Sequence, residues 1–415
     1  MVSNPAAAFW EAATVFPLLV SAALLMAPIA TPPQAAPGVR LRSIAADPTT
    51  GVARAVVVEE GALVHTALMF PEDQEGRLQG GTDAGAQAAR VLANIELALR
   101  EARTTLDHLV RLHVYVADPS VTGRIDRLLA ERFGGRETQP AVTFVETAMP
   151  RAGTLVAMDA IAATAWTPAP GAASRLTAAA LPQRTGRASH AAVQPAGPFV
   201  IVSGRAARGD FEPAIRETLA QLRGDLETVG LTFGDVVQIK SFLGDMRSAR
   251  RLEEIVASAF DGTRVPPQVV TEWRQESVPA EIELVATARR TGDGRRRVEH
   301  IEPISGRYSR IARVNDGQPV FVSGLYGGSA DPVAQVGEMF AELQRVLLEA
   351  GSDIRHLVKA TYYVSDTAAD DRINAIRPTV YDVERPPAAS KLSVRGTGRA
   401  GRASTFDMIA VTTAR

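Results

Sequence analysis

Side chains that could carry out catalysis are few in this 415-residue chain, and their spacing excludes several kinds of site. The chain has no cysteine, which excludes disulfides, zinc–thiolate sites and a cysteine nucleophile. No two of its six histidines have the H-E-x-x-H spacing of a zinc-binding helix, so we predict no metal site. The segment Gly396–Gly401 matches G-x-G-x-x-G, but the residues after it predict a strand, whereas a dinucleotide site requires a helix there. We therefore interpret this segment as a hairpin loop and predict no cofactor.

The charges of the chain argue against a nucleic-acid partner. Lys and Arg total 45 against 46 Asp and Glu, which gives a formal net charge of −1. The sequence contains no basic patch with interleaved aromatic residues, the pattern that nucleic-acid binding favours. We therefore predict that the chain binds no nucleic acid.

The N-terminal segment differs in composition from the rest of the chain. Residues Ala12–Ala30 are apolar apart from one threonine, one serine and two prolines, and a segment rich in Pro and Ala follows. This order is typical of an export signal or an N-terminal anchor, although no Lys or Arg precedes Arg40. A periplasmic or secreted location and a cytoplasmic one both remain open. We exclude residues 1–42 from the predicted fold and predict no other membrane segment.

The elements that would position a site recur three times in the same order, the pattern of internal repeats. An extended apolar segment is followed by a long amphipathic helix, in which Ile215, Leu219, Leu222 and Leu226 share one face. Next come a strand, a second helix, a proline step and a final apolar strand. The first of these strands is expected at 109–116, 236–243 and 357–364. The final strand is expected at 155–162, 281–286 and 405–411.

Turn-rich linkers separate the three copies, so we predict three α+β modules at 43–166, 172–291 and 298–415. In the strand at 109–116, Arg111, His113 and Tyr115 alternate onto one face. This face is expected either to be half-solvated or to line the interior between the modules.

All three copies resemble the RidA/YjgF superfamily, also called Rid or endoribonuclease L-PSP-like, and the third copy does so most closely. The resemblance rests on Val358–Asp366, on Arg385-Pro386-Pro387-Ala388 and on Asp407–Ala410. It implies a small α+β module that forms homotrimers with a central β-barrel, outer helices and a ligand cleft at each subunit boundary. Three modules in one chain then imply a single-chain pseudo-trimer that is monomeric.

The same resemblance assigns chemistry to two positions. Family enzymes hydrolyse 2-imino or enamine acids to 2-keto acids and ammonia, using an Arg directly after Pro-Ala and a Glu in the final strand. At the Arg position this chain has Val142, Gln268 and Ala389. At the Glu position it has Ala157, Glu281 and Thr405. A tyrosine near the start of the module is present only as Tyr308.

These replacements favour a protein that binds a small metabolite, such as a carboxylate or an imino or keto acid, in the clefts between modules. We expect Glu281 to act as acceptor or base, Gln268 to orient the ligand and Tyr308 to contribute from the neighbouring module. Two alternatives remain open: a purely structural scaffold, and an imine or enamine deaminase that uses a displaced arginine. The candidates for that arginine are Arg274, Arg395, Arg399 and Arg402.

A threefold Ser–Lys site, as in the cyanuric acid hydrolase and barbiturase family, is excluded by the scarcity of lysine. The only lysines are Lys240, Lys359 and Lys391, so the first copy has none.

Overall fold

The three predicted copies fold into the same series of elements in the computed structural model, which describes residues 38–168, 172–260, 262–290 and 296–413. These residues belong to one compact unit. The apolar segment 12–30 lies outside the described residues, so an export signal or anchor stays a prediction. Among the residues described, no helix has the length and apolarity needed to cross a membrane.

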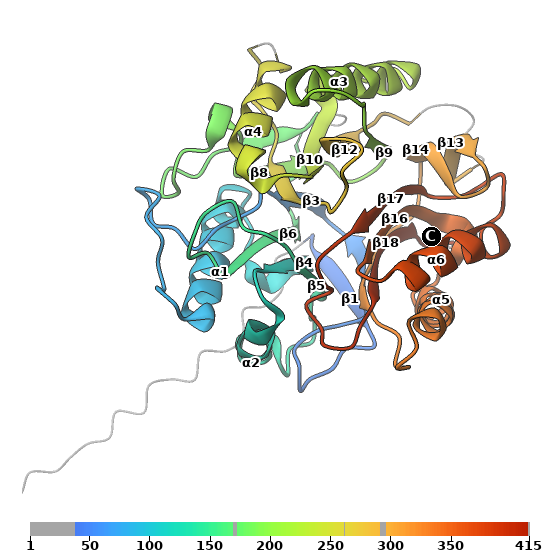
Figure 1. Cartoon of the computed structure of the whole chain (residues 1–415), viewed down its shortest axis with the longest axis horizontal. Coiled ribbons are helices and arrows are strands. Elements are labelled where there is room, and N and C mark those ends of the chain that lie inside the picture. Colours follow the sequence, from blue (N-terminus) through green and yellow to red (C-terminus); the bar gives the residue numbers. More distant parts are fainter. Residues whose placement is uncertain (1–37, 169–171, 261, 291–295, 414–415) are drawn as a thin grey trace, which may run out of the picture. The chain divides into compact units, whose positions relative to one another are not determined.

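Each module has the order β-β-β-α-β-α-β-β, and Figure 1 shows its two helices beside its strands. The first module has β1 (Arg40–Ile44), β2 (Ala55–Glu60), β3 (Ala62–Thr66), α1 (Ala84–Glu101), β4 (Leu109–Val116), α2 (Thr122–Phe133), β5 (Ala141–Glu146) and β6 (Val156–Thr164). The second has β7 (Ser174–Leu176), β8 (Ala191–Gln194), β9 (Phe199–Arg205), α3 (Phe211–Thr228), β10 (Val236–Leu243), α4 (Ala249–Ser258), β11 (Gln268–Glu272) and β12 (Ala280–Thr287). The third has β13 (Val298–Ile304), β14 (Tyr308–Val314), β15 (Pro319–Leu325), α5 (Pro332–Glu349), β16 (Leu357–Val364), α6 (Thr367–Val380), β17 (Ala388–Ser393) and β18 (Ser404–Val411).

The predicted α+β repeat is therefore confirmed, with β1 starting at Arg40, before the predicted start at 43. The long helices form where apolar residues repeat at helical spacing, and these residues are buried against the sheet. In α1 they include Val91, Ile95 and Leu99, all fully buried. Asp83 caps this helix by accepting hydrogen bonds from the backbone N–H of Gly85 and Ala86.

Backbone ladders between strands join every pair of modules. Antiparallel pairing links β3 to β8, β9 to β14, and β2 to β15. The described strands form a 12-stranded sheet and a 6-stranded sheet. Both have free ends, so the closed barrel that the resemblance implies is not found among these ladders. The modules are nevertheless joined through main-chain hydrogen bonds between strands. These bonds do not depend on which side chains occupy the paired positions.

Candidate functional site

Glu281 on β12 lies at the boundary between the second and third modules. Its carboxylate packs against Gly204 at the end of β9, where a Cβ would come within 2.1 Å of Glu281 Oε1. A side chain at position 204 would therefore displace this carboxylate. From the third module, the Ser390 hydroxyl on β17 donates to the neighbouring Glu283 at 2.5 Å and lies close enough to lower the pKa of Glu281. Side chains of the second and third modules thus surround this acid.

The surroundings of Glu281 favour its neutral form more than water does. Burial raises its pKa to about 7, and the neighbouring Glu283 adds to the rise against the opposing effects of Ser390, Lys359 and Arg310. The buried Glu281 Oε1 has no hydrogen-bond partner among the described residues. A carboxyl group with a pKa near neutrality can both donate and accept a proton, as a general acid–base catalyst must.

Arg310 supplies a cation to this boundary. It lies two residues after Tyr308 on β14, so both side chains project from one face of the strand. The guanidinium carbon is 5.6 Å from the centroid of the Tyr308 ring. Nη1 donates to the carbonyl of Gly204 at 3.4 Å, whereas the buried Nε has no partner among the described residues. Arg310 was not among the displaced arginines proposed from the sequence, although its alternation with Tyr308 was a usable signal.

Gln268 belongs to a different boundary from Glu281. Strand β10 lies between β11, which carries Gln268, and β12, which carries Glu281. Gln268 pairs with Ile239 of β10, and Glu281 pairs with Phe242 of β10. Strand geometry then puts their Cα atoms on the order of 14 Å apart. The Gln268 carbonyl accepts a hydrogen bond from Leu68 N of the first module at 3.0 Å. The structure thus places Tyr308, beside Arg310, at the boundary that contains Glu281, and it does not bring Gln268 there.

A buried ionic cluster joins the three modules in the interior. His113 on β4 is hydrogen-bonded through Nδ1 to Asp159, at 3.1 Å, and through Nε2 to Asp407 of the third module. Lys240 of the second module lies 3.4 Å from Asp159. Burial alone would raise the pKa of Asp159, but Lys240, His113 and Arg111 together hold it well below its usual range. The alternating polar face of β4 therefore lines the interior and is not solvated.

Comparison with known proteins identifies the fold family. A sequence model described as Endoribonuclease L-PSP matches residues 46–164, 179–289 and 300–400. The chain belongs to the endoribonuclease L-PSP family. The three matches confirm the predicted resemblance to RidA/YjgF proteins and the tandem repeat.

Individual relatives correspond to one module each. A RutC family protein of Pyrococcus abyssi is 32% identical over 106 residues, which are 25% of this chain and 81% of that protein. Protein DfrA of Myxococcus xanthus is 29% identical over 114 residues, covering 26% of this chain and 86% of the relative. The solved structure of the Rid family protein YyfB from Yersinia pestis is 29% identical, covers 28% of this chain and 89% of that one, and has a TM-score of 0.26.

The remaining positions at which this chain departs from the family pattern are closely packed. Ala157 is fully buried, and Thr405 Oγ1 donates to the carbonyl of Leu325 at 3.0 Å. A Cβ on Gly324 would come within 2.2 Å of the Val142 carbonyl oxygen. Ala389 N donates to Ser203 Oγ at 2.8 Å, across the boundary between the second and third modules. Ala389 therefore lies at the Glu281 boundary, where the family's arginine is missing and Arg310 supplies a positive charge.

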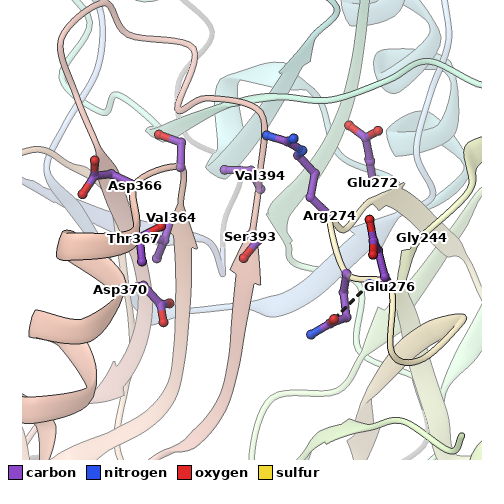
Figure 2. Close-up of a pocket in the computed structure, with 12 residues that line it drawn as sticks. Gly244, Glu272, Arg274, Glu276, Val364, Asp366, Thr367, Asp370, Ser393 and Val394 are labelled. Atoms are coloured by element: carbon purple, nitrogen blue, oxygen red, sulfur yellow. Dashed lines mark hydrogen bonds between the residues drawn. The ribbon is translucent and has the colours of Figure 1, made fainter.

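One of the proposed displaced arginines, Arg274, lines a polar cavity of about 540 Å³ between the second and third modules. Figure 2 shows Arg274 beside Glu272 and Val394, with Asp366 and Asp370 across the cavity. Arg395 pairs with Glu272 through two contacts, of 2.5 and 2.8 Å. Glu281 and Tyr308 do not line this cavity, so Arg274 faces a different space from theirs.

The other two, Arg399 and Arg402, line a cavity of about 810 Å³ between the first and third modules. Arg399 makes a two-pronged ion pair with Asp126 on α2, at 2.5 and 2.9 Å. Its guanidinium carbon also lies 4.2 Å from the centroid of the Phe144 ring. This boundary has Val142 and Thr405 at the family's two key positions, and it therefore has cations but no acid in the place of Glu281.

Proposed function

We propose that this family member is a single-chain pseudo-trimer that binds a small carboxylate-bearing metabolite at the boundary between its second and third modules. One observation carries the proposal: a buried acceptor, Glu281 Oε1, and a buried donor, Arg310 Nε, both lack partners there. Buried polar groups in folded proteins are almost always hydrogen-bonded, because an unsatisfied group costs roughly 1–3 kcal/mol. A ligand with complementary groups would remove this cost at both atoms.

The chemistry of the two side chains indicates how such a ligand would bind. A guanidinium pairs with a carboxylate through two parallel hydrogen bonds, which favours a 2-keto or 2-imino acid over a neutral molecule. Glu281, with its pKa of about 7, can then donate to a keto oxygen or accept from an imino or amino nitrogen. Tyr308 beside Arg310 contributes an aromatic face and a hydroxyl group.

Titration calorimetry with pyruvate on the full chain tests this proposal. We expect Arg310→Gln to weaken binding about tenfold or more, because a charge-assisted hydrogen bond is lost. Arg307→Gln is the matched control, since Arg307 is exposed and adjacent to the same strand. Equal affinity in the parent and Arg310→Gln proteins would overturn the assignment.

Deaminase activity is a second candidate function, favoured by the near-neutral pKa of Glu281. In this reaction water adds to the C=N carbon of 2-iminopropanoate while Glu281 takes a proton from the water. That proton passes to nitrogen and gives a carbinolamine. The proton of its hydroxyl group then moves to the nitrogen as the C–N bond breaks and the C=O bond forms, and pyruvate and ammonia leave. Pyruvate release above the uncatalysed rate, abolished in Glu281→Gln, supports this function. If the protein binds pyruvate but forms none from 2-iminopropanoate, its function is limited to binding.

A further inference from the structure

The cavity between the first and third modules has its own chemistry, independent of Glu281. It is lined from the first module by the connection between β1 and β2 and by α2, and from the third by Tyr326, Gly328 and the loop before β18. Its volume of about 810 Å³ is within the range of metabolite sites. Neither Glu281 nor Arg310 lines it, so a ligand here would be separate from the one proposed above.

Two arginines hold fixed positive charges at this cavity, one from each module. Arg54 of the first module donates from Nη1 to the Gly324 carbonyl at 3.0 Å. Arg402 of the third module donates from Nη1 to the Gly327 carbonyl. A carbonyl oxygen fixes a guanidinium in place without neutralising it. Within the described part of the chain neither arginine has an ion pair, whereas Arg399 is already paired with Asp126.

The other charged groups of the cavity do not cancel these two. Arg127 is exposed and adds a third cation without an ion pair in the described residues. Asp47 is the second carboxylate, and it accepts a hydrogen bond from the backbone N–H of Thr49 at 2.8 Å. Glu342 on α5 lies near Arg54 but is hydrogen-bonded to Arg345 at 2.7 and 2.8 Å. An excess of positive charge therefore remains at the cavity.

We infer that this cavity binds a small organic molecule with a doubly charged anionic group, a phosphate monoester or a dicarboxylate, held between Arg54 and Arg402. Each guanidinium keeps N–H groups beyond the one it gives to a carbonyl, and their planar arrangement suits phosphate and carboxylate oxygens. Two cations from opposite modules match a dianion better than a single carboxylate. The hydroxyl groups of Thr49 and Thr50 and the ring of Tyr326 line the space for the rest of the molecule.

The experiment titrates the full chain with glycerol 3-phosphate, succinate and lactate at low ionic strength, using calorimetry. In the Arg310→Gln protein, which lacks the site proposed above for carboxylates, we expect glycerol 3-phosphate or succinate to bind at one site per chain and lactate to bind at least about tenfold more weakly. Binding of only one of the two dianions still supports the inference and identifies which group is recognised. Absence of binding by both dianions would overturn it.

Variants connect this binding to the two arginines. Arg54→Gln and Arg402→Gln remove the charge and keep a polar side chain with an N–H donor. Each is expected to weaken dianion binding about tenfold or more, and Arg402→Lys is expected to recover part of the loss. Arg372→Gln is the control, since Arg372 is an exposed arginine on α6. Unchanged affinity in both Gln variants would overturn the inference. Pyruvate binding that depends on Arg310 is measured separately, so the two proposals fail independently.

Discussion

His113 and Asp407 are hydrogen-bonded to each other in the interior, although 294 positions separate them in the sequence. The bond joins β4 of the first module to β18 of the third. Lys240 adds the second module, with its Nζ 2.9 Å from His113 Nδ1. A single cluster of charges thus involves all three modules, in addition to the strand ladders between them.

Replacing Asp407 by Asn should destabilise the protein. Asp407 is 3% exposed and bonds Arg111 at 3.2 Å and the Ser323 hydroxyl at 3.1 Å. Without this carboxylate, Arg111 is buried without its counter-charge, a change that costs about 3–5 kcal/mol. Urea unfolding of Asp407→Asn measures the loss, with Asp371→Asn on the exposed face of α6 as the control. A loss below about 1 kcal/mol would contradict a stabilising role for the cluster.

The elements could be predicted from the sequence because each depends on local periodicity. The strands at 109–116, 236–243 and 357–364 have the predicted bounds. The partners of individual side chains could not be predicted in this way. Gln268 and Glu281 lie in one module, yet each faces a different neighbour, and only the packing of modules decides which. The alternation of Arg310 with Tyr308 could be read from the sequence, but the proximity of Arg310 to Glu281 of another module could not.

The chain should be monomeric in solution. Each module already pairs its strands with both others, through β3–β8, β9–β14 and β2–β15. All three of these ladders form within one chain. Light scattering on the eluting protein should therefore give one chain mass, 44.1 kDa. A mass of three chains would show that the modules pair between chains.

Restoring an arginine should create or raise deaminase activity at one boundary only. Ala389→Arg places a guanidinium at the boundary that contains Glu281, so we expect faster pyruvate release from 2-iminopropanoate. Gln268→Arg places one at the boundary with Ala157, which has no acid, and no increase is expected. Because Ala389 is 9% exposed, unfolding curves must first show that both variants fold. An increase with Gln268→Arg alone would contradict the assignment of boundaries.

The raised pKa of Glu281 should make stability depend on pH. Below the ordinary value of 4.5 the folded and unfolded states are both protonated, so the group has no effect. Between 4.5 and about 7 the folded state keeps a proton that the unfolded state has lost, so stability falls as pH rises. Above about 7 the full penalty is present, up to roughly 3 kcal/mol for a shift of this size. Glu281→Gln has no such penalty and should gain stability relative to the parent between pH 4.5 and pH 8.

Urea unfolding at both pH values measures this gain, and the difference between parent and variant cancels the contributions of other titrating groups. Glu276→Gln, which removes an exposed glutamate from the loop before β12, is the control and should give parallel curves. A ligand held by Arg310 should lower the pKa of Glu281 if it brings a cationic nitrogen, and raise it if it brings a second carboxylate near the group. Repeating the titration with pyruvate therefore tests the geometry of the site as well. A Glu281→Gln variant whose stability follows that of the parent at every pH would show that Glu281 is solvated as in water.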